Sequence, residues 1–255
     1  ALDAGFFYAE SENTPMHVGS VAVFDGPPPS YGDVVRLLLS KLPLKYEPGT
    51  TWWYSRSTDV LGRLIEVVSG MTLGEFIDKR ISKPLGMADT AFSVAPAKTA
   101  RFAEPFPADK QGLVLTYTNP TKPVKFEAGG QGLTSTVMDY ALFAHMLLNG
   151  GVLDGVRLLS PKTIELMTVS HTTDLPAVSA AGPGRGFGLG FFVVTDLGAT
   201  QTLGSVGNYG WSGIYGTTFW VDPKERLVAI MMVQRYPGSP VATAFQPLVY
   251  QALTK

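Results

Sequence analysis

Three short β-rich runs in the last third of the chain restrict its fold more than any other sequence feature. They cover residues 186–195, 211–221 and 226–234, and Asp222-Pro223-Lys224-Glu225 separates the last two. Short runs of this kind, joined by turn-forming residues, predict antiparallel strands that follow one another as a meander. The C-terminal third is therefore expected to supply a sheet whose strands are neighbours in sequence.

Helices are expected in the middle of the chain. Apolar residues recur at helical spacing from Ser57 until Gly70 ends the segment. A second helix begins at once, where Thr72 and Glu75 have capping-box spacing, and is expected to stop before Pro84. Further helices are expected over residues 136–148, from Ser160-Pro161 onward, and over residues 239–253.

The N-terminal region predicts one strand and one helix. Residues 16–24 alternate as a half-buried strand does, and residues 31–42 carry a broad apolar stripe. Helices in the middle with strands toward both ends indicate an α+β protein, in which an antiparallel sheet is flanked by helices.

Composition excludes several classes of function. The formal net charge is −1, without a basic cluster, so nucleic acid is not an expected partner. There is no cysteine, and His17, His145 and His171 are too scattered for a zinc site, so neither a metal nor another cofactor is expected. No apolar run is long enough to span a membrane and no signal peptide is visible, which favours a soluble, cytoplasmic protein.

Four segments in register resemble one enzyme family. Pro48-Gly49-Thr50 followed by Tyr54-Ser55-Arg56 and an apolar helix is similar to the PGT and YSN segment of class C β-lactamases and family VIII esterases. The matching continuations are Ile81 to Thr90 (PLGM-DT), Gly129 to Thr136 (GG-GL-ST), and Gly210 to Thr217 with Phe219 to Pro223. The resemblance implies a β-lactamase/transpeptidase-like fold for residues 45–255.

The nucleophile motif of that family is missing. In the resembled hydrolases a serine and a lysine three residues later lie on one helical face. None of the lysines in this chain has a serine three residues before it. The motif normally lies upstream of the YSN segment, so the N-terminal region is expected to have replaced it.

By the same resemblance, Tyr54 takes the place of the family's general base. A free tyrosine has a pKa of about 10, so it needs a nearby cation to act as a base at neutral pH. Arg56, at the family's Asn position, could supply that charge or could point to solvent. The alternative for Tyr54 itself is a half-buried aromatic residue at a helix start.

The run Trp211-Ser212-Gly213 matches the third motif, which is KTG in β-lactamases. Trp211 in place of lysine removes the charge that would pair with a β-lactam carboxylate, which favours neutral acyl esters. The match implies that the Ile214 amide donates to an oxyanion. The alternative is an ordinary strand beside a glycine-rich bend.

Candidates for a substitute nucleophile are Ser55, Ser212 and, if the N-terminal strand docks at the site, Ser20 or His17. Aromatic residues could form an acyl pocket, although core packing would explain each of them as well: Trp52, Trp53, Tyr209, Trp211 and Tyr215.

The first 44 residues resemble a different family. Thr14 to Ser20 and Phe24 to Pro27 look like the extreme N-terminus of bacterial wax ester synthase/diacylglycerol acyltransferases, whose HHxxxDG motif is absent here. We therefore expect a chimeric chain: a strand-helix segment over residues 1–44 that completes the sheet of a β-lactamase/esterase-like domain, truncated at its own N-terminus, over residues 45–255.

These features predict a lipolytic carboxylesterase that acts on small or medium acyl esters, with Tyr54 as base. Two alternatives follow from the missing nucleophile motif. The chain could be an inactive remnant that binds a partner or ligand, or it could form a homo-oligomer through an exposed edge strand.

Overall fold

The structure is a computed structural model that describes residues 46–47, 49–54, 56–104, 106–107, 119–122, 124, 126–172, 175, 182–236 and 240–254. The expected strand at residues 16–24 and the expected helix at residues 31–42 lie outside the described residues. The elements, in chain order, are α2 (Ser57–Ser69), α3 (Leu73–Ile77), the π-helix η2 (Asp78–Ser82), α4 (Lys83–Leu85), the 3-10 helix η3 (Pro96–Arg101), β1 (Phe106–Pro107), α5 (Val137–Leu148), β2 (Val152–Leu153), β3 (Val156–Arg157), α6 (Pro161–Met167), β4 (Arg185–Phe187), β5 (Phe192–Val194), α7 (Leu197–Thr200), β6 (Tyr209–Ser212), β7 (Thr218–Asp222), β8 (Leu227–Met231), β9 (Arg235–Tyr236) and α8 (Pro240–Gln251).

The central sheet is the antiparallel meander that the sequence predicts. Its five strands lie in the order β4-β5-β6-β7-β8, and every neighbouring pair is antiparallel. Two of the three predicted runs contain two strands each, because glycine-rich turns at residues 188–190 and 213–216 divide them. The separate pairs β1-β9 and β2-β3 are parallel and antiparallel, respectively.

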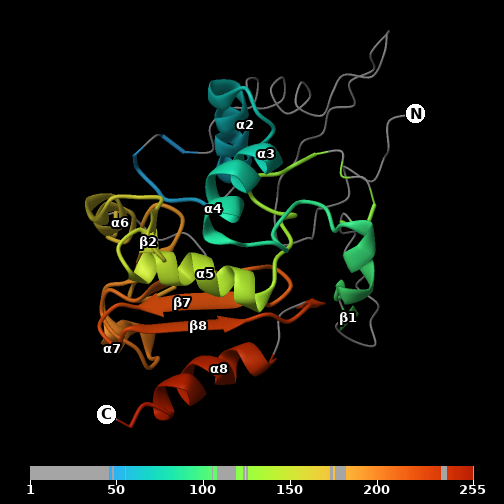
Figure 1. Cartoon of the computed structure of the whole chain (residues 1–255). Helices are drawn as coiled ribbons and strands as arrows, with labels where there is room; N and C mark the ends of the chain where they lie inside the picture. The colour runs from blue at the N-terminus through green and yellow to red at the C-terminus, as the bar shows by residue number, and fades with distance from the viewer. Residues whose placement is uncertain are drawn as a thin grey trace.

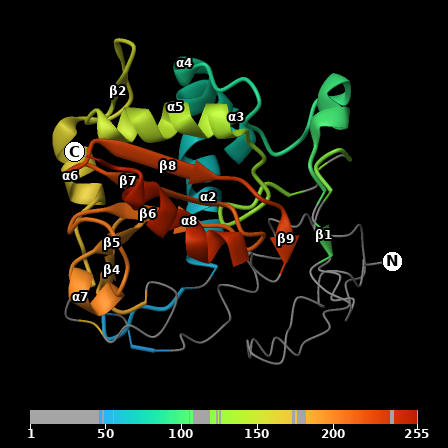
Figure 2. The same cartoon turned by 90° about the horizontal axis from the view of Figure 1, so that it is seen from below.

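Helices cover both faces of this sheet, which confirms the predicted α+β class. Figure 1 shows α5 above strands β7 and β8 and α8 below them, and Figure 2 shows the same layers from a second side. The α5 side holds the main core, in which Met146 and Leu147 pack with Tyr209 and Val221, all almost fully buried. On the other side, Trp220 of β7 packs edge-on against Phe245 of α8.

The helix boundaries follow their capping residues. Gly70 ends α2 in the left-handed conformation (φ 68°), and Thr72 and Glu75 form the predicted capping box of α3. Thr136 and Ser160 cap α5 and α6 with their side chains. These local signals are independent of the rest of the fold, which is why the sequence locates these four helices correctly.

The expected stop before Pro84 is wrong. The chain stays helical from Leu73 through η2 to Leu85, with Pro84 in the first turn of α4. Pro84 follows directly on the π-turn, in which the Lys83 N–H donates to the Asp78 carbonyl five residues back. The wider π-turn of η2 precedes α4 and continues the helical path into it.

The apolar residues that predicted α2 do not form its buried face. Leu61, Leu64 and Val68 are between half and four-fifths exposed, whereas Asp59 and Gly62 are buried. The polar edge of α2 packs instead against the loop that precedes α5. The helix prediction is confirmed, but the face of α2 that packs against the protein is the one with Asp59 and Gly62, not the apolar one.

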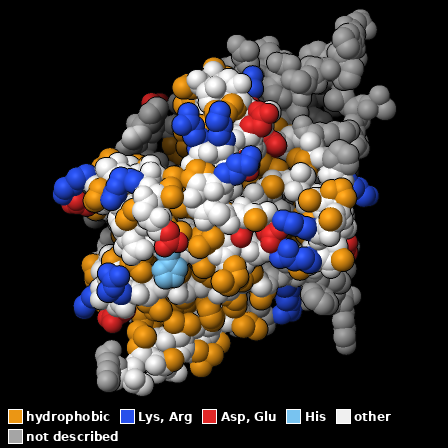
Figure 3. Space-filling view, in the orientation of Figure 1, with side chains coloured by type: hydrophobic (Ala, Val, Ile, Leu, Met, Phe, Trp, Pro, Cys, Tyr) orange, Lys and Arg blue, Asp and Glu red, His pale blue; other side chains and the backbone are white. Residues whose placement is uncertain are grey.

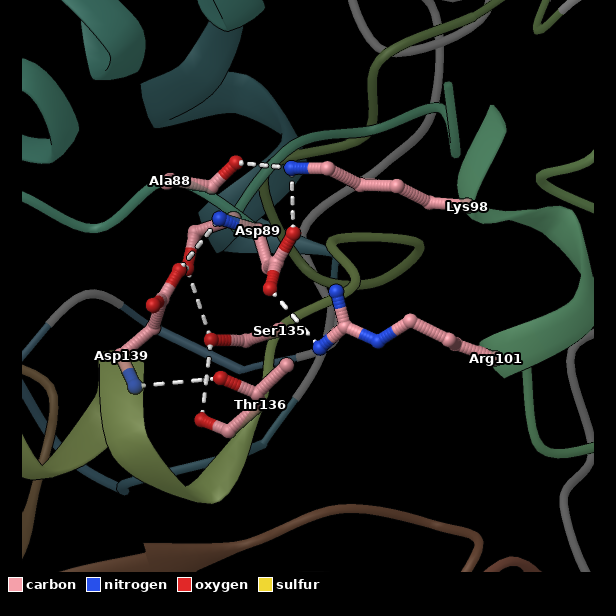
Figure 4. Close-up of polar contacts among 8 residues, drawn as sticks. Ala88, Asp89, Lys98, Arg101, Ser135, Thr136 and Asp139 are labelled. Carbon is pink, nitrogen blue, oxygen red and sulfur yellow. Dashed lines mark hydrogen bonds and ion pairs between the residues drawn. The ribbon is translucent and has the colours of Figure 1, made fainter. Parts of the chain in front are cut away.

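A polar network joins the segment after α4 to the start of α5 (Figure 4). One carboxylate oxygen of Asp139 accepts the backbone N–H of Asp89 at 2.7 Å and the hydroxyl of Thr90 at 2.9 Å. The Asp89 carboxylate lies 2.5 Å from Lys98 and 2.9 Å from Arg101. Because Asp139 is buried, these bonds fix the two segments relative to each other.

Charged and hydrophobic side chains are distributed differently on the face of the molecule seen in Figure 3. Lys and Arg side chains are spread over it, and hydrophobic side chains gather below, over the sheet and α8. Leu248 of α8 is 62% exposed. Within the described part of the chain, no helix combines the length and apolar character that crossing a membrane requires.

Candidate functional site

Tyr54 and Trp211, which the sequence analysis takes from two distant motifs, lie in contact. Their ring centroids are 5.3 Å apart. Trp52 lies 6.3 Å from Tyr54 and 4.7 Å from Phe187, which in turn packs edge-on against Trp211 at 5.2 Å. We call the cluster the aromatic wall; its members are Trp52, Tyr54, Phe187, Phe192 and Trp211.

Helices α2 and α3, which follow Tyr54 in the chain, are held by the segment before α5 that includes the glycine-rich loop. The Gly130 N–H donates to the buried carboxylate of Asp59 at 2.9 Å. A Cβ at Gly129 would lie 2.0 Å from the Thr58 carbonyl oxygen, so only glycine fits there. The Glu127 carboxylate also accepts the Gly74 N–H at 2.7 Å. Two of the four motifs thus pack directly on each other.

Trp211 lies near the end of β6, where the strand enters a tight hairpin turn. The Gly213 N–H donates to the Thr217 carbonyl at 2.8 Å, and the Gly216 N–H donates to the Gly213 carbonyl at 3.0 Å. Gly216 is left-handed (φ 87°), as expected for a three-residue hairpin loop with a glycine bulge. The Ile214 N–H forms no hydrogen bond within the described part of the chain, and Ile214 is 62% exposed.

Two further site candidates, Ser212 and Arg56, are not directed toward the aromatic wall. Ser212 follows Trp211 on β6, and successive strand residues point to opposite faces, so Ser212 faces away from the Trp211 side. The Arg56 guanidinium lies 3.6 Å from the Asp59 carboxylate, so its charge is directed to that partner. Ser55, together with Ser20 and His17, lies outside the described residues.

Tyr215 and Gly213 shape the turn. The Tyr215 carbonyl accepts the Arg235 N–H at 2.8 Å, which ties the turn to β9. A Cβ at Gly213 would lie 2.3 Å from the Thr217 hydroxyl oxygen. Both residues therefore lie in a turn that is fixed on each side of Ile214.

The aromatic residues suggested for an acyl pocket lie in different places. Trp52 and Trp211 belong to the aromatic wall, but Trp53 pairs with Tyr46, and Tyr209 is 1% exposed and packs on Phe191 in the core. Sequence reasoning missed Phe187 and Phe192. The hairpin signal in residues 186–192, in which glycines separate aromatic residues, could have placed them opposite each other.

Ionisable groups in the described segments form no cluster of three or more His, Asp or Glu side chains suited to a metal ion. The arrangement around Tyr54 offers instead an aromatic surface and a phenol. Tyr54 is 45% exposed.

Comparison with known proteins shows which family the chain is similar to. The profile of the Beta-lactamase family matches residues 12–252, a range that begins upstream of the expected junction near Leu44; that junction stays a prediction. Protein Rv1367c of Mycobacterium tuberculosis is 37% identical over 83% of this chain, and esterase EstB of Burkholderia gladioli is 27% identical over 83%.

A solved structure has the same fold. Simvastatin synthase (LovD) from Aspergillus terreus superimposes with a TM-score of 0.71 at 24% identity, over 88% of this chain and 63% of that one. The chain spans 56% of Rv1367c and 57% of EstB, a little over half of each relative. Because the family profile matches residues 12–252, nearly the whole length of the chain, the chain belongs to the Beta-lactamase family.

Proposed function

We propose that this chain is a serine-hydrolase-type carboxylesterase that acts on small or medium acyl esters. The observation that carries the proposal is the contact between Tyr54 and Trp211, since it joins the phenol of one motif to the strand of another. The likeness to an esterase in the same family, EstB, supports this choice of reaction.

Each group has a defined role in the proposed reaction. Tyr54 acts in its ionised form: the phenolate oxygen accepts the proton of a serine hydroxyl while the serine oxygen attacks the ester carbonyl carbon. The Ile214 N–H donates to the resulting oxyanion. The bond to the alcohol then breaks, Tyr54 returns its proton to the leaving alcohol, and water releases the acid by the same steps.

The aromatic wall supports a preference for uncharged groups next to the scissile bond. Trp211 and Phe187 present apolar ring surface beside Tyr54. Trp211 stands where β-lactamases have a lysine, so that strand position has no cation for the carboxylate of a β-lactam. We therefore infer that esters are preferred over lactams.

Replacement of Tyr54 by Phe tests the base. General-base catalysis contributes about 10²–10⁴-fold, so Tyr54→Phe should lower kcat for p-nitrophenyl butyrate by about 100-fold or more. Tyr46→Phe makes the same chemical change outside the aromatic wall and should leave the rate within twofold. If Tyr54→Phe and Tyr46→Phe hydrolyse the ester at the same rate, Tyr54 is not the base.

Fluorophosphonate labelling followed by peptide mass spectrometry would identify the nucleophile, with Ser55 and Ser212 as the candidates.

The absence of a serine three residues before any lysine favours a second candidate function, an inactive remnant that binds esters without cleaving them. Hydrolysis by neither the unmodified chain nor its variants, together with no labelling, would support that alternative.

A further inference from the structure

Arg185 is a partly buried cation without a carboxylate partner among the described residues. It opens β4, and its guanidinium carbon lies 4.7 Å from the centroid of the Phe192 ring. None of the described ion pairs includes it. Its Nε atom is buried and has no hydrogen-bond partner in the described structure.

This arrangement leaves the charge of Arg185 poorly compensated. Burial lowers the pKa of the guanidinium, yet arginine starts so high that it stays charged at neutral pH. The contact with the Phe192 ring returns only part of the lost hydration, because such pairs contribute about 0.5–2 kcal/mol. An anionic ligand would supply the missing partner.

Arg185 lies beside the aromatic wall. Arg185 and Phe187 are two positions apart on β4, so their side chains lie on the same face of that strand. Phe187 is directly opposite Phe192 in the sheet, and Phe192 lies 6.5 Å from Trp211. The guanidinium is therefore separated from Trp211 by a single ring, that of Phe192.

We propose that Arg185 binds a carboxylate at the far end of the acyl group, so that the preferred substrates are monoesters of dicarboxylic acids. The proposal rests on the proposed esterase function and narrows its substrate class. The uncharged carbon chain would lie along the aromatic wall, with the ester at Tyr54 and the carboxylate at Arg185. This arrangement is compatible with Trp211. Trp211 stands where the resembled β-lactamases have a lysine, so the cation is missing beside the ester, whereas Arg185 supplies one at the other end of the acyl group.

A pair of substrates that differ only in charge tests the assignment. We would compare mono-p-nitrophenyl adipate with its methyl ester, methyl p-nitrophenyl adipate. Charge-assisted hydrogen bonds are worth enough to give about 10–100-fold in kcat/KM. We expect the unmodified chain to prefer the carboxylate substrate by that factor, and Arg185→Met to reduce the ratio by at least tenfold.

Two more variants make the result specific. Arg185→Lys keeps the charge but loses the planar fork, so its ratio should fall between those of the unmodified chain and Arg185→Met. Arg80→Met removes an exposed arginine of η2 and should leave the ratio unchanged. Thermal unfolding of each variant would show whether the fold is intact. An unchanged ratio in a folded Arg185→Met variant would overturn the proposal.

Binding separates failure of this proposal from failure of the esterase function. Adipate and dimethyl adipate are titrated while tryptophan fluorescence is followed, because two of the four tryptophans, Trp52 and Trp211, belong to the aromatic wall. If the chain hydrolyses neither ester, the esterase function fails, but tighter binding of adipate that Arg185→Met abolishes still supports the anion site. No adipate binding, or equal affinity in both chains, overturns the site.

Discussion

At the scale of single residues, the best-defined electrostatic feature is the Asp89 carboxylate. Its hydrogen bonds to Lys98 and then Arg101 hold its pKa below the ordinary value of 3.8 (Figure 4). A carboxyl group whose pKa is lower when folded binds fewer protons in the native state than in the unfolded one. Its contribution to stability is therefore present above pH 4 and is lost as the pH falls through the folded value.

The pH dependence of unfolding tests this reasoning. The urea midpoint of the unmodified chain should fall between pH 5 and pH 3 more steeply than that of Asp89→Asn, which cannot titrate. At pH 7 the variant should be the less stable of the two. Parallel pH profiles for the two proteins would show that the two cations do not stabilise the ionised carboxylate.

Residue-level predictions depended on how far each signal reaches along the chain. Tyr54 and Trp211 could be proposed because each stands within a short motif, and their contact follows from the family resemblance. Phe187 and Phe192 could not, because neither belongs to a motif and their role depends on the register between β4 and β5. That no described residue forms an ion pair with Arg185 is visible only in three dimensions.

At the scale of elements, the Tyr250 hydroxyl links α8 to β7 and to the residue just before β6 through hydrogen bonds. Tyr250 donates to the fully buried Asp222 carboxylate at 2.7 Å and accepts from the Asn208 amide at 2.7 Å. Burial, and then the hydrogen bond to Asp222, raise the pKa of Tyr250 above its ordinary value. The phenol therefore stays protonated and remains a donor throughout the neutral range.

Tyr250→Phe should destabilise the protein by about 1–3 kcal/mol, because it leaves the Asp222 carboxylate without this donor and the Asn208 amide without its acceptor. Chemical denaturation at pH 7 measures the change. Tyr46→Phe is the matched control, since Tyr46 is exposed and lies outside this network. A loss no larger than that of the control would mean that water replaces the hydroxyl.

Elements with local signals were predicted well, and those set by packing were not. Caps and C-terminal glycines located α2, α3, α5 and α6, since these signals act within one turn of helix. The run at residues 186–195 gave strand character but not its division into β4 and β5. The exposed apolar face of α2 likewise depends on which edge meets the Gly129–Gly130 loop, a contact that sequence periodicity does not contain.

At the scale of the whole molecule, the fold class follows from the order of elements, whereas the site does not. All five strands of the sheet come from residues 185–231, so each strand pairs with one close to it in sequence. Tyr54 and Trp211, in contrast, are separated by more than half the chain. The bond from Gly130 to Asp59, which holds α2, likewise joins residues 71 positions apart.

This difference in range has a kinetic consequence. Contacts between near neighbours form sooner than distant ones, because closing a longer loop costs more chain entropy. During refolding, pulsed hydrogen exchange should detect protection in peptides from residues 209–231 before protection in α2. Simultaneous protection of both regions would contradict this order. If this order holds, the sheet forms early in folding. The contact between Tyr54 and Trp211, which joins distant parts of the chain, forms only in the last stage.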